Sequence, residues 1–449
     1  MNLLKYISLS MALSGGIAAL TSCDRLIEVS SPANLITAEK IFEDSLLLED
    51  ALLNCYLTLD FHEQFLPYLG LYVDELTTAS QLTQHQEFLT NALTPESNLG
   101  NLSVWRSLYS AIYQANFIVE GLEQPGGELS LSPAYRRVLG EAKFVRAYSY
   151  FYLVNLWGDV PLVLIADVSR TAATGRHPVS EVYDQIIADL TDARMLLSAA
   201  GTQAKSRAGA AAATALLSRV LLYRGDWSGA ERESATVIAG FPPLEAPLEG
   251  LFKAGHPETI FELWKERGYS FGATYIPATS TGAPTLVVRD GLLELLDEQD
   301  GRRSAYVSVN GSGLHFPYKY KLRTVSAEPE YDVLLRLPEL YLINAEAKLM
   351  LGDITGSIDM LNAVRQRAGL AGLDHSLPGD AVVRALIDER ARELFCEGGH
   401  RFFDLKRLGL IDEVMAATKP TWESGAKLFP IPQQEMDRNP RLTQNEGYN

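Results

Sequence analysis

Hydrophobic residues recur at helical spacing along most of the chain, whereas alternating, strand-like patterns are scarce and short. Apolar stripes of this kind predict helices over residues 37–57, 104–122 and 135–156. The third helix is expected to end before Gly158 and Pro161, because neither residue continues a helix readily. The pattern therefore predicts a mainly α fold.

Two segments, 221–230 and 348–357, resemble each other at an offset of 127 residues. Each is predicted to be a helix, a Gly-Asp turn and a second helix. Near the first copy, the small residues Ser218 and Ala230 and the later Pro242 match positions of a tetratricopeptide repeat. Paired antiparallel helices approach closely only where the crossing side chains are small. These features predict a tetratricopeptide-like scaffold; the alternative is two ordinary helical hairpins with glycine turns.

Residues 241–334 have a different texture, rich in proline and glycine, with short β-prone runs such as 259–263. This segment is predicted to be a loop-rich insertion. Long irregular segments carried on a rigid framework often hold binding residues.

The first residues indicate a secretory leader, because Lys5 precedes an apolar stretch, 7–20, that is too short to span a bilayer comfortably. The leader ends in Leu-Thr-Ser before Cys23, which resembles the lipobox of bacterial lipoproteins. Cys23 would then become the acylated first residue of the mature protein, and two or more acyl chains anchor a protein stably. The alternative is a plain secretory peptide in which Cys23 is incidental.

Composition and charge narrow the function. The 449 residues are 47% hydrophobic and 21% charged, which is typical of a globular protein with a large core. The formal net charge of −17 argues against nucleic acid and against adhesion to anionic lipid. Cys55 and Cys396 are too few for a disulfide scaffold and are expected to be buried helix residues, with a single bridge left open.

Few candidate catalytic motifs are present. The chain has no His-Glu-x-x-His motif and no phosphate-binding Gly-x-x-x-x-Gly-Lys motif. Glu397, His400 and Asp404 have a spacing that would put them on one face of a helix, where they could hold a metal. The competing interpretation is structural: these carboxylates form ion pairs, with Arg401 and Arg407 bonded to neighbouring carboxylates.

Several segments closely resemble proteins of the SusD/RagB family: 146–152, 157–162, 335–347, 361–370, 387–407, 428–432, 439–440 and 444–448. The most specific is 387–407, which is similar to the family signature Glu-Arg, Glu-Leu, Glu-Gly-x-Arg-Trp/Phe-x-Asp-Leu. It departs from the signature by a second glycine, Gly399 after Gly398. The resemblance covers nearly all of the chain after Cys23.

The resemblance implies a lipoprotein on the outer face of the outer membrane. Such a protein lids a SusC-like TonB-dependent transporter and delivers an oligosaccharide to it, without catalysis and without a cofactor. Two alternatives stay open: RagB-like binding of peptides for the same kind of transporter, and a tetratricopeptide scaffold that binds only proteins.

The predicted division is a signal peptide over 1–22, an N-terminal helical region over 23–240, the insertion over 241–334 as candidate ligand-binding face, and the signature region over 335–449.

Carbohydrate capture needs aromatic faces for stacking, with polar groups around them. Two regions are candidates: 72–105, which the resemblance places near the ligand, and the insertion. Tyr269, Phe271 and Tyr275 lie among glycines that we expect to leave their rings uncovered, and Trp105 is the candidate from the first region. The first region is otherwise poor in aromatic residues, which argues slightly against starch-like ligands.

Overall fold

The computed structural model describes residues 37–448, apart from 60, 124–131, 202–203, 246, 267 and 270. The chain divides into two units, Met1–Leu47 and Leu48–Asn449, which are described separately. The expected leader and the expected lipid-attachment residue, Cys23, lie outside the described residues. Within the described residues, no helix combines the length and apolar character needed to cross a membrane.

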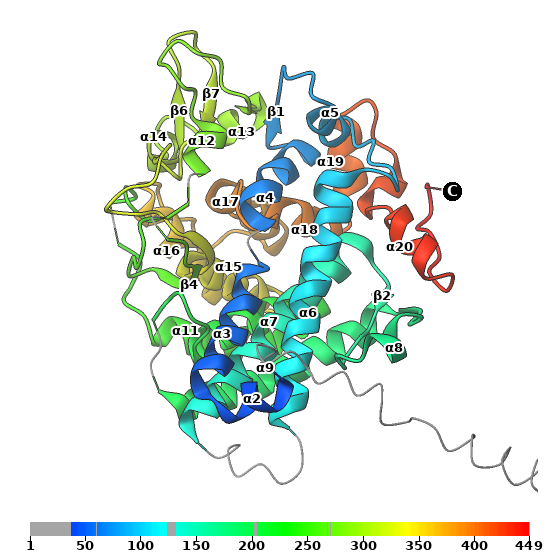
Figure 1. Cartoon of the computed structure of the whole chain (residues 1–449). Helices are drawn as coiled ribbons and strands as arrows, with labels where there is room; N and C mark the ends of the chain where they lie inside the picture. Colours follow the sequence, from blue (N-terminus) through cyan, green and yellow to red (C-terminus); the bar gives the residue numbers. More distant parts are fainter. Residues whose placement is uncertain are drawn as a thin grey trace, which may run out of the picture. The chain divides into compact units, whose positions relative to one another are not determined.

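Helices make up most of the described chain (Figure 1). Those of eight residues or more are α3 (Ser45–Leu57), α4 (Phe61–Tyr72), α6 (Ser103–Leu122), α7 (Pro133–Trp157), α9 (Val179–Ala200), α10 (Ala210–Arg224), α11 (Trp227–Ala239), α15 (Leu337–Met350), α16 (Ile354–Arg367), α17 (Gly379–Leu394), α18 (His400–Arg407) and α19 (Ile411–Thr418). The shorter ones are α2 (Ala38–Glu43), α5 (Thr83–Leu89), α8 (Val168–Thr171), α12 (Phe271–Tyr275), α13 (Asp290–Leu295), α14 (Gly301–Tyr306), α20 (Gln433–Arg438), the π-helical turn η1 (Asn98–Leu102) and the 3-10 turn η3 (Ser424–Lys427). The predicted mainly α fold is confirmed.

The strands within the described residues form two-stranded antiparallel sheets. The pairs are β1 (Leu76–Thr77) with β5 (Val287–Val288), β2 (Val160–Pro161) with β3 (Arg176–His177), β4 (Thr259–Leu263) with β8 (Asp332–Arg336), and β6 (Val307–Val309) with β7 (His315–Pro317). Each sheet either joins segments that are distant in sequence or forms a short hairpin.

The long helices of the second unit pack in chain order: α6 on α7, α7 on α9, α9 on α10, α10 on α11, α11 on α15, and α15 on α16 and α17. Within this stack, helix α7 is packed between α6 and α9 and is buried on all its faces from Gly140 to Val154. Apolar and aromatic side chains all round a helix are typical of such a position. The stack gives the second unit a rigid scaffold of helical hairpins.

The two Gly-Asp turns have the same construction, which explains their repeated sequence. Gly225 and Gly352 have φ angles of 76° and 87°, in the region that favours glycine. Asp353 then caps α16, because its Oδ1 accepts a hydrogen bond from the backbone N–H of Gly356 at 2.9 Å. A Cβ on Gly356 would lie 2.2 Å from a carboxylate oxygen of Asp353. Asp226 caps α11 in the same way, so the predicted helical hairpins are confirmed.

The predicted helices 104–122 and 135–156 correspond to α6 and α7. Helix α7 ends at Gly158, whose φ of 75° stops it as expected. The prediction of one continuous helix over 37–57 is wrong, because α2 and α3 are separated at Asp44. Asp44 has an extended backbone, and its carboxylate accepts a hydrogen bond from the N–H of Leu46 at 2.8 Å, which starts a new helix.

Between α11 and α15, the described residues form only short elements of two to six residues. The β-prone run 259–263 is strand β4, fully buried and paired with β8 along the start of α15. The irregular texture predicted for 241–334 is therefore observed. The division of the chain into three regions with these boundaries stays a prediction.

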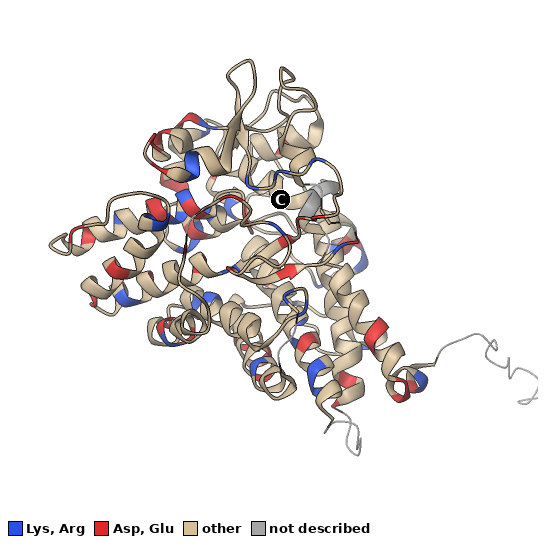
Figure 2. Ribbon diagram, turned by 90° about the vertical axis from the view of Figure 1, so that its left-hand side faces the viewer, with Lys and Arg blue, Asp and Glu red and all other residues tan. Residues whose placement is uncertain are grey.

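Buried ion pairs fix this irregular segment to α17. The Glu393 carboxylate receives hydrogen bonds from Arg336 and Arg367, each at 2.5 Å, and Arg302 donates to Glu389 at 2.7 Å. All five side chains are at most 5% exposed. Buried charges persist only when they are paired and hydrogen-bonded, as they are in this cluster. Acidic and basic residues are both scattered over the helices (Figure 2).

Candidate functional site

The two regions expected to lie near a ligand meet at the sheet of β1 and β5. Leu76 pairs with Val288, and Thr77 pairs with Val287. The connection continues past the strands, because the N–H of Arg289 donates to the carbonyl of Glu75 at 3.0 Å. Part of the segment 72–105 and part of the insertion are thereby joined as one surface.

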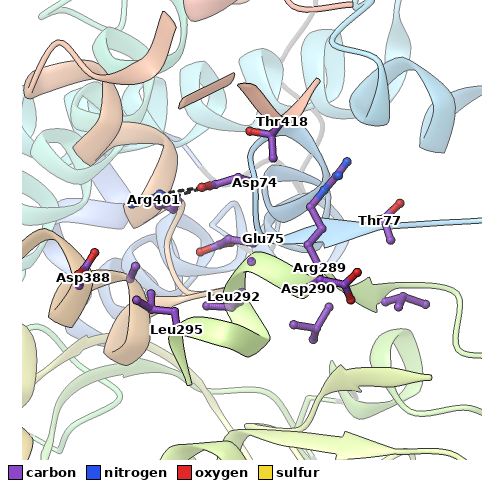
Figure 3. A pocket seen from close by; sticks show the side chains of 14 residues that line it. Asp74, Glu75, Thr77, Arg289, Asp290, Leu292, Leu295, Asp388, Arg401 and Thr418 are labelled. Carbon is purple, nitrogen blue, oxygen red and sulfur yellow. Dashed lines mark hydrogen bonds and ion pairs between the residues drawn. The ribbon is translucent and has the colours of Figure 1, made fainter. Parts of the chain in front are cut away.

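The signature region adds a third wall, and the three walls enclose a cavity of about 520 Å³. Figure 3 shows its residues converging from three segments that are distant in sequence. The lining consists of Asp74, Glu75, Thr77, Val287, Val288, Arg289, Asp290, Gly291, Leu292, Leu295, Asp388, Ala391, Arg401 and Thr418. We refer to this cavity as the β1–β5 pocket.

An ion pair closes one side of the β1–β5 pocket. The Arg401 guanidinium donates from Nε to Asp74 Oδ1 at 2.9 Å and from Nη2 to Asp74 Oδ2 at 2.6 Å (Figure 3). Burial alone would lower the pKa of Arg401, but its hydrogen bonds and attraction to Asp74 raise that pKa above its usual value. The two-point geometry fixes both side chains, so this pair is a rigid part of the wall.

Glu75 is the buried carboxyl group of the pocket, with 6% of the residue exposed. Its Oε2 accepts a hydrogen bond from the backbone N–H of Cys396 at 3.2 Å. Its Oε1 accepts none from the residues that the structure describes. Burial raises the pKa of Glu75 to about 7, and the nearby Asp74 carboxylate contributes to the rise. Glu75 can therefore donate or accept a hydrogen bond near neutral pH.

Arg289 supplies a cationic group of the pocket from the insertion, and the Asp74 carboxylate is near enough to act on its pKa. Its Nε donates to the carbonyl of Leu76 at 2.9 Å, which holds the side chain along β1. Figure 3 shows its terminal nitrogens at the end of an extended side chain, with no ion pair to another residue drawn. Burial lowers the pKa of Arg289 from its usual value, but a guanidinium stays charged at neutral pH.

The pocket offers hydrogen-bonding groups rather than stacking surfaces. Its polar side chains are four carboxyl groups, two guanidinium groups and the hydroxyls of Thr77 and Thr418. None of its fourteen lining residues is aromatic. A ligand of this pocket would have to be rich in hydroxyl, amide or charged groups.

Three of the predicted ligand-binding residues, Tyr269, Phe271 and Tyr275, are only 3% to 4% exposed. The expectation that neighbouring glycines leave these rings uncovered is wrong. A Cβ on Gly272 would lie 2.4 Å from the carbonyl oxygen of Leu322, so the glycine lets another backbone segment approach and cover the rings.

The same rings also contact one another and a third ring. Tyr269 and Phe271 are stacked with centroids 5.5 Å apart, and Phe271 lies 4.6 Å from Tyr320. None of these aromatic residues lines the β1–β5 pocket. A direct contact between them and a ligand stays a prediction.

Trp105, the fourth predicted residue, is 4% exposed and lies on α6. Its ring meets the edge of Trp157 at 5.2 Å and lies 5.0 Å from Tyr109. Trp105 does not line the β1–β5 pocket, and its role in binding stays a prediction.

The ion-pair interpretation of the signature block is confirmed. The Glu397 carboxylate bonds to Lys319 and Arg336, and Asp404 bonds to Arg390. Glu397, His400 and Asp404 do not share one helix face, because α18 begins only at His400 and Glu397 lies before it. Burial, together with nearby arginines, lowers the pKa of His400 well below its usual value, so this ring is neutral.

The arginines of the same block behave as predicted. Arg401 pairs with Asp74, and Arg407 pairs with Glu346 and Asp404. Within the described part of the chain, no three His, Cys, Asp or Glu residues gather as a metal site.

The two cysteines beyond Cys23 form no disulfide. Cys55 is a fully buried residue of α3, as expected. The expectation for Cys396 is wrong, because it lies in the turn between α17 and α18 with φ of 55° and is partly exposed. That turn continues through Gly398 and Gly399, which also have positive φ angles.

The insertion contains one sequence that matches a catalytic motif. Residues 268–272 read Gly-Tyr-Ser-Phe-Gly, which matches the Gly-x-Ser-x-Gly pattern of serine hydrolases. In those enzymes the serine sits on a sharp turn directly between a strand and a helix. Here residues 264–269 separate β4 from Ser270, and Ser270 lies outside the described residues. The string therefore lacks the sequence context of that motif.

Comparison with known families decides the membership of the chain. Residues 65–222 match a family described as "Starch-binding associating with outer membrane". Residues 296–423, which include the signature block, match the SusD family. The chain belongs to the SusD family.

Full-length relatives support the membership. A SusD-like protein of Formosa agariphila is 24% identical over 515 residues, covering 95% of this chain and 96% of the relative. A second one from the same organism is 26% identical and covers 96% and 97%. The starch-binding protein SusD of Bacteroides thetaiotaomicron is 35% identical over 132 residues, which is 27% of this chain and 22% of that protein.

Solved structures share the SusD fold. A SusD superfamily protein of Bacteroides vulgatus superposes with a TM-score of 0.79 at 22% identity, covering 91% of this chain and all of the other. A laminarin-binding SusD-like protein superposes with a TM-score of 0.73 at 24% identity, covering 89% and 99%. At these identities the likeness concerns the fold.

The sequence indicated the two regions that meet at the pocket, but none of the predicted ligand-binding residues lines it. Asp74 and Glu75 belong to the first region, and Arg289 and Asp290 to the second. Their type alone gave little signal, because the chain has 56 acidic residues. The deciding fact is the pairing of β1 with β5, which no local pattern indicates.

Proposed function

We propose that this SusD-family chain is a surface-exposed lipoprotein that captures an oligosaccharide and delivers it to a SusC-like TonB-dependent transporter. The observation that carries the proposal is the β1–β5 pocket. It joins both regions expected near a ligand and is built on the rigid helical stack.

The chemistry of the pocket supports a sugar ligand. Hydroxyl groups both donate and accept hydrogen bonds, and the pocket offers Glu75 and Arg289 together with the hydroxyls of Thr77 and Thr418. Ligand sites use a few well-placed polar groups of this kind to orient their ligand. The starch-binding description of the matched family supports the same class of ligand.

Binding without turnover is part of the proposal. Glycoside hydrolysis needs two free carboxyl groups on opposite sides of the scissile bond. In the pocket, Arg401 occupies both oxygens of Asp74, so Asp74 cannot serve in such a pair, and a turnover assay tests the three other carboxyl groups. Incubation of the purified protein with polysaccharides should release no sugar. Cleavage that is abolished by one carboxylate substitution would refute this part of the proposal.

The anchor and the partner complete the proposal. Acyl chains on Cys23 would hold the protein at the outer membrane, facing the cell exterior. The barrel transporter would receive the ligand. Co-purification from membranes should recover the barrel, and replacement of Cys23 by alanine should release the protein from the membrane fraction.

A peptide ligand is the second candidate. Two features of the pocket lining support it. The lining lacks aromatic rings and carries charges of both signs, which suits peptide backbones and charged side chains. Calorimetric titration with oligosaccharides and with a mixed peptide library separates the two candidates. Binding of peptides and of no glycan would replace the oligosaccharide proposal by the peptide one.

A further inference from the structure

The charges that line the β1–β5 pocket do not balance. Two arginines, Arg289 and Arg401, face four carboxyl groups. Arg401 is fully engaged with Asp74 through two hydrogen bonds, so this pair presents no net charge to a ligand. The remaining groups are one guanidinium, Arg289, and three carboxyl groups.

The three remaining carboxyl groups are Glu75, Asp290 and Asp388. Asp290 and Asp388 are exposed at the rim, on the first turn of α13 and on α17. No ion pair joins either of them to another residue that the structure describes. Both therefore add an unpaired negative charge to the lining of the pocket.

A lysine beside the lining does not restore the balance. Lys419 follows the lining residue Thr418, but its Nζ donates to the carbonyl of Leu71, and the side chain is 3% exposed. Burial, together with the nearby Arg289, lowers the pKa of Lys419 to about 6, so the amine is mostly uncharged at neutral pH. The net charge of the whole chain, −17, has the same sign as the pocket.

We infer that the β1–β5 pocket selects its oligosaccharide by charge, with preference for amino-bearing sugars over neutral ones and rejection of sulfated or uronic-acid sugars. This inference rests on the proposed function. The physical reason is that two rim carboxylates attract a sugar ammonium group and repel a sulfate or carboxylate. At an exposed site each such interaction is weak, and two of them together correspond to about tenfold in affinity.

The test compares hexamers that differ in charge. A glycan array that carries neutral, amino, sulfated and uronic-acid oligosaccharides is probed first. Hexamers of glucosamine, N-acetylglucosamine and galacturonic acid are then titrated by calorimetry at slightly acidic pH, where the sugar amines are protonated. We expect the glucosamine hexamer to bind about tenfold more tightly than its acetylated counterpart, and the galacturonic acid hexamer to bind most weakly.

Substitution of the rim carboxylates should remove this preference. In the variant Asp290→Asn with Asp388→Asn, glucosamine and N-acetylglucosamine hexamers should bind within about twofold of each other. The matched control is Glu181→Gln with Asp184→Asn, which removes two exposed charges from α9 outside the pocket. The control should keep the tenfold preference.

The outcomes separate this inference from the proposed function. If sulfated or uronic-acid sugars bind most tightly, or if the rim variant keeps the full preference, the charge inference is overturned while oligosaccharide capture stands. If nothing on the array binds, both are overturned.

Discussion

Helix α17 has carboxylates on two faces, and the two faces differ in their access to solvent. On one face, Glu389 and Glu393 are buried and paired with arginines on all sides. On another face, Asp388 and Ala391 line the open β1–β5 pocket. A carboxylate whose oxygens are all paired therefore stabilises the fold. A carboxylate with unpaired oxygens remains available to a ligand.

The difference explains why Glu393 and Glu397, two carboxylates of the family signature, do not line the pocket. These two carboxylates are paired with Lys319 and Arg302 from the insertion and with Arg336 at the end of β8. They hold that irregular segment against α17 and so position Arg289 and Asp290 at the pocket. Substitutions on the two faces of α17 should therefore change the free energy of unfolding by different amounts.

The largest effect is expected in the buried cluster. Replacement of Arg302 by Met leaves Asp300 and Glu389 as buried charges without their main partner, which should lower the free energy of unfolding by about 3–5 kcal/mol. Urea unfolding followed by circular dichroism measures it. Arg384→Met is the matched control, because this arginine pairs with Asp380 at the surface and should contribute less than about 1 kcal/mol. Equal effects of the two variants would contradict the distinction between the clusters.

The next effect concerns Glu75 and depends on pH. The pKa of this carboxyl rises from 4.5 to about 7 on folding, so the folded state binds the proton more tightly. Stability therefore falls as pH rises from about 4.5 to about 7 and stays lower above that range, by at most about 3 kcal/mol. Glu75→Gln should be more stable than the parent at pH 8 and show a smaller difference at pH 4. Thermal melts across this range that run in parallel would show that Glu75 is not the responsible group.

A smaller effect is expected at the hairpin turns. Gly356→Ala places a Cβ against the Asp353 carboxylate and disturbs the cap of α16, at a cost of about 1 kcal/mol. Gly291→Ala is a useful control, because no atom lies within 4 Å of the added Cβ. Chemical unfolding of both variants tests whether the repeated Gly-Asp-x-x-Gly sequence reflects this cap. A Gly356→Ala variant as stable as the parent would speak against it.

The smallest effect on stability belongs to the pocket rim. Asp388→Asn changes an exposed side chain without an ion pair, so the free energy of unfolding should change by less than about 0.5 kcal/mol. Only ligand affinity should respond. A marked loss of stability in this variant would mean that Asp388 belongs to the structural cluster instead.

Most of the fold could be predicted from the sequence, and the site only in part. Helical spacing and the Gly-Asp turns are local patterns, so α6, α7 and both hairpins were correctly expected. Asp44 interrupts the first predicted helix through a side-chain hydrogen bond that competes with the helix. Burial of Tyr269 and Phe271 depends on contact with Leu322 and Tyr320, far along the chain, and no local pattern reports such contacts.

The pocket shows the same limit. Its walls are joined by the pairing of Leu76 with Val288, and its charge balance depends on the Asp74–Arg401 bond across most of the chain. The resemblance suggested the region 72–105 and the irregular texture suggested the insertion, and both regions contribute to the pocket. Neither could indicate which carboxylates are neutralised, because that depends on which side chains meet in three dimensions.

The most direct test of the central claim is calorimetric titration of the protein with the oligosaccharide that binds best on the glycan array. The parent, Arg289→Ala and Arg224→Ala would be compared after circular dichroism shows all three to be folded. Arg224 is a partly exposed arginine of α10 outside the pocket and serves as the control.

If the β1–β5 pocket captures the sugar, Arg289→Ala should weaken binding by about tenfold or more, because a charge-assisted hydrogen bond is lost. Arg224→Ala should bind like the parent. Unchanged affinity in a folded Arg289→Ala protein would contradict the assignment of the pocket, and binding of peptides alone would contradict oligosaccharide capture.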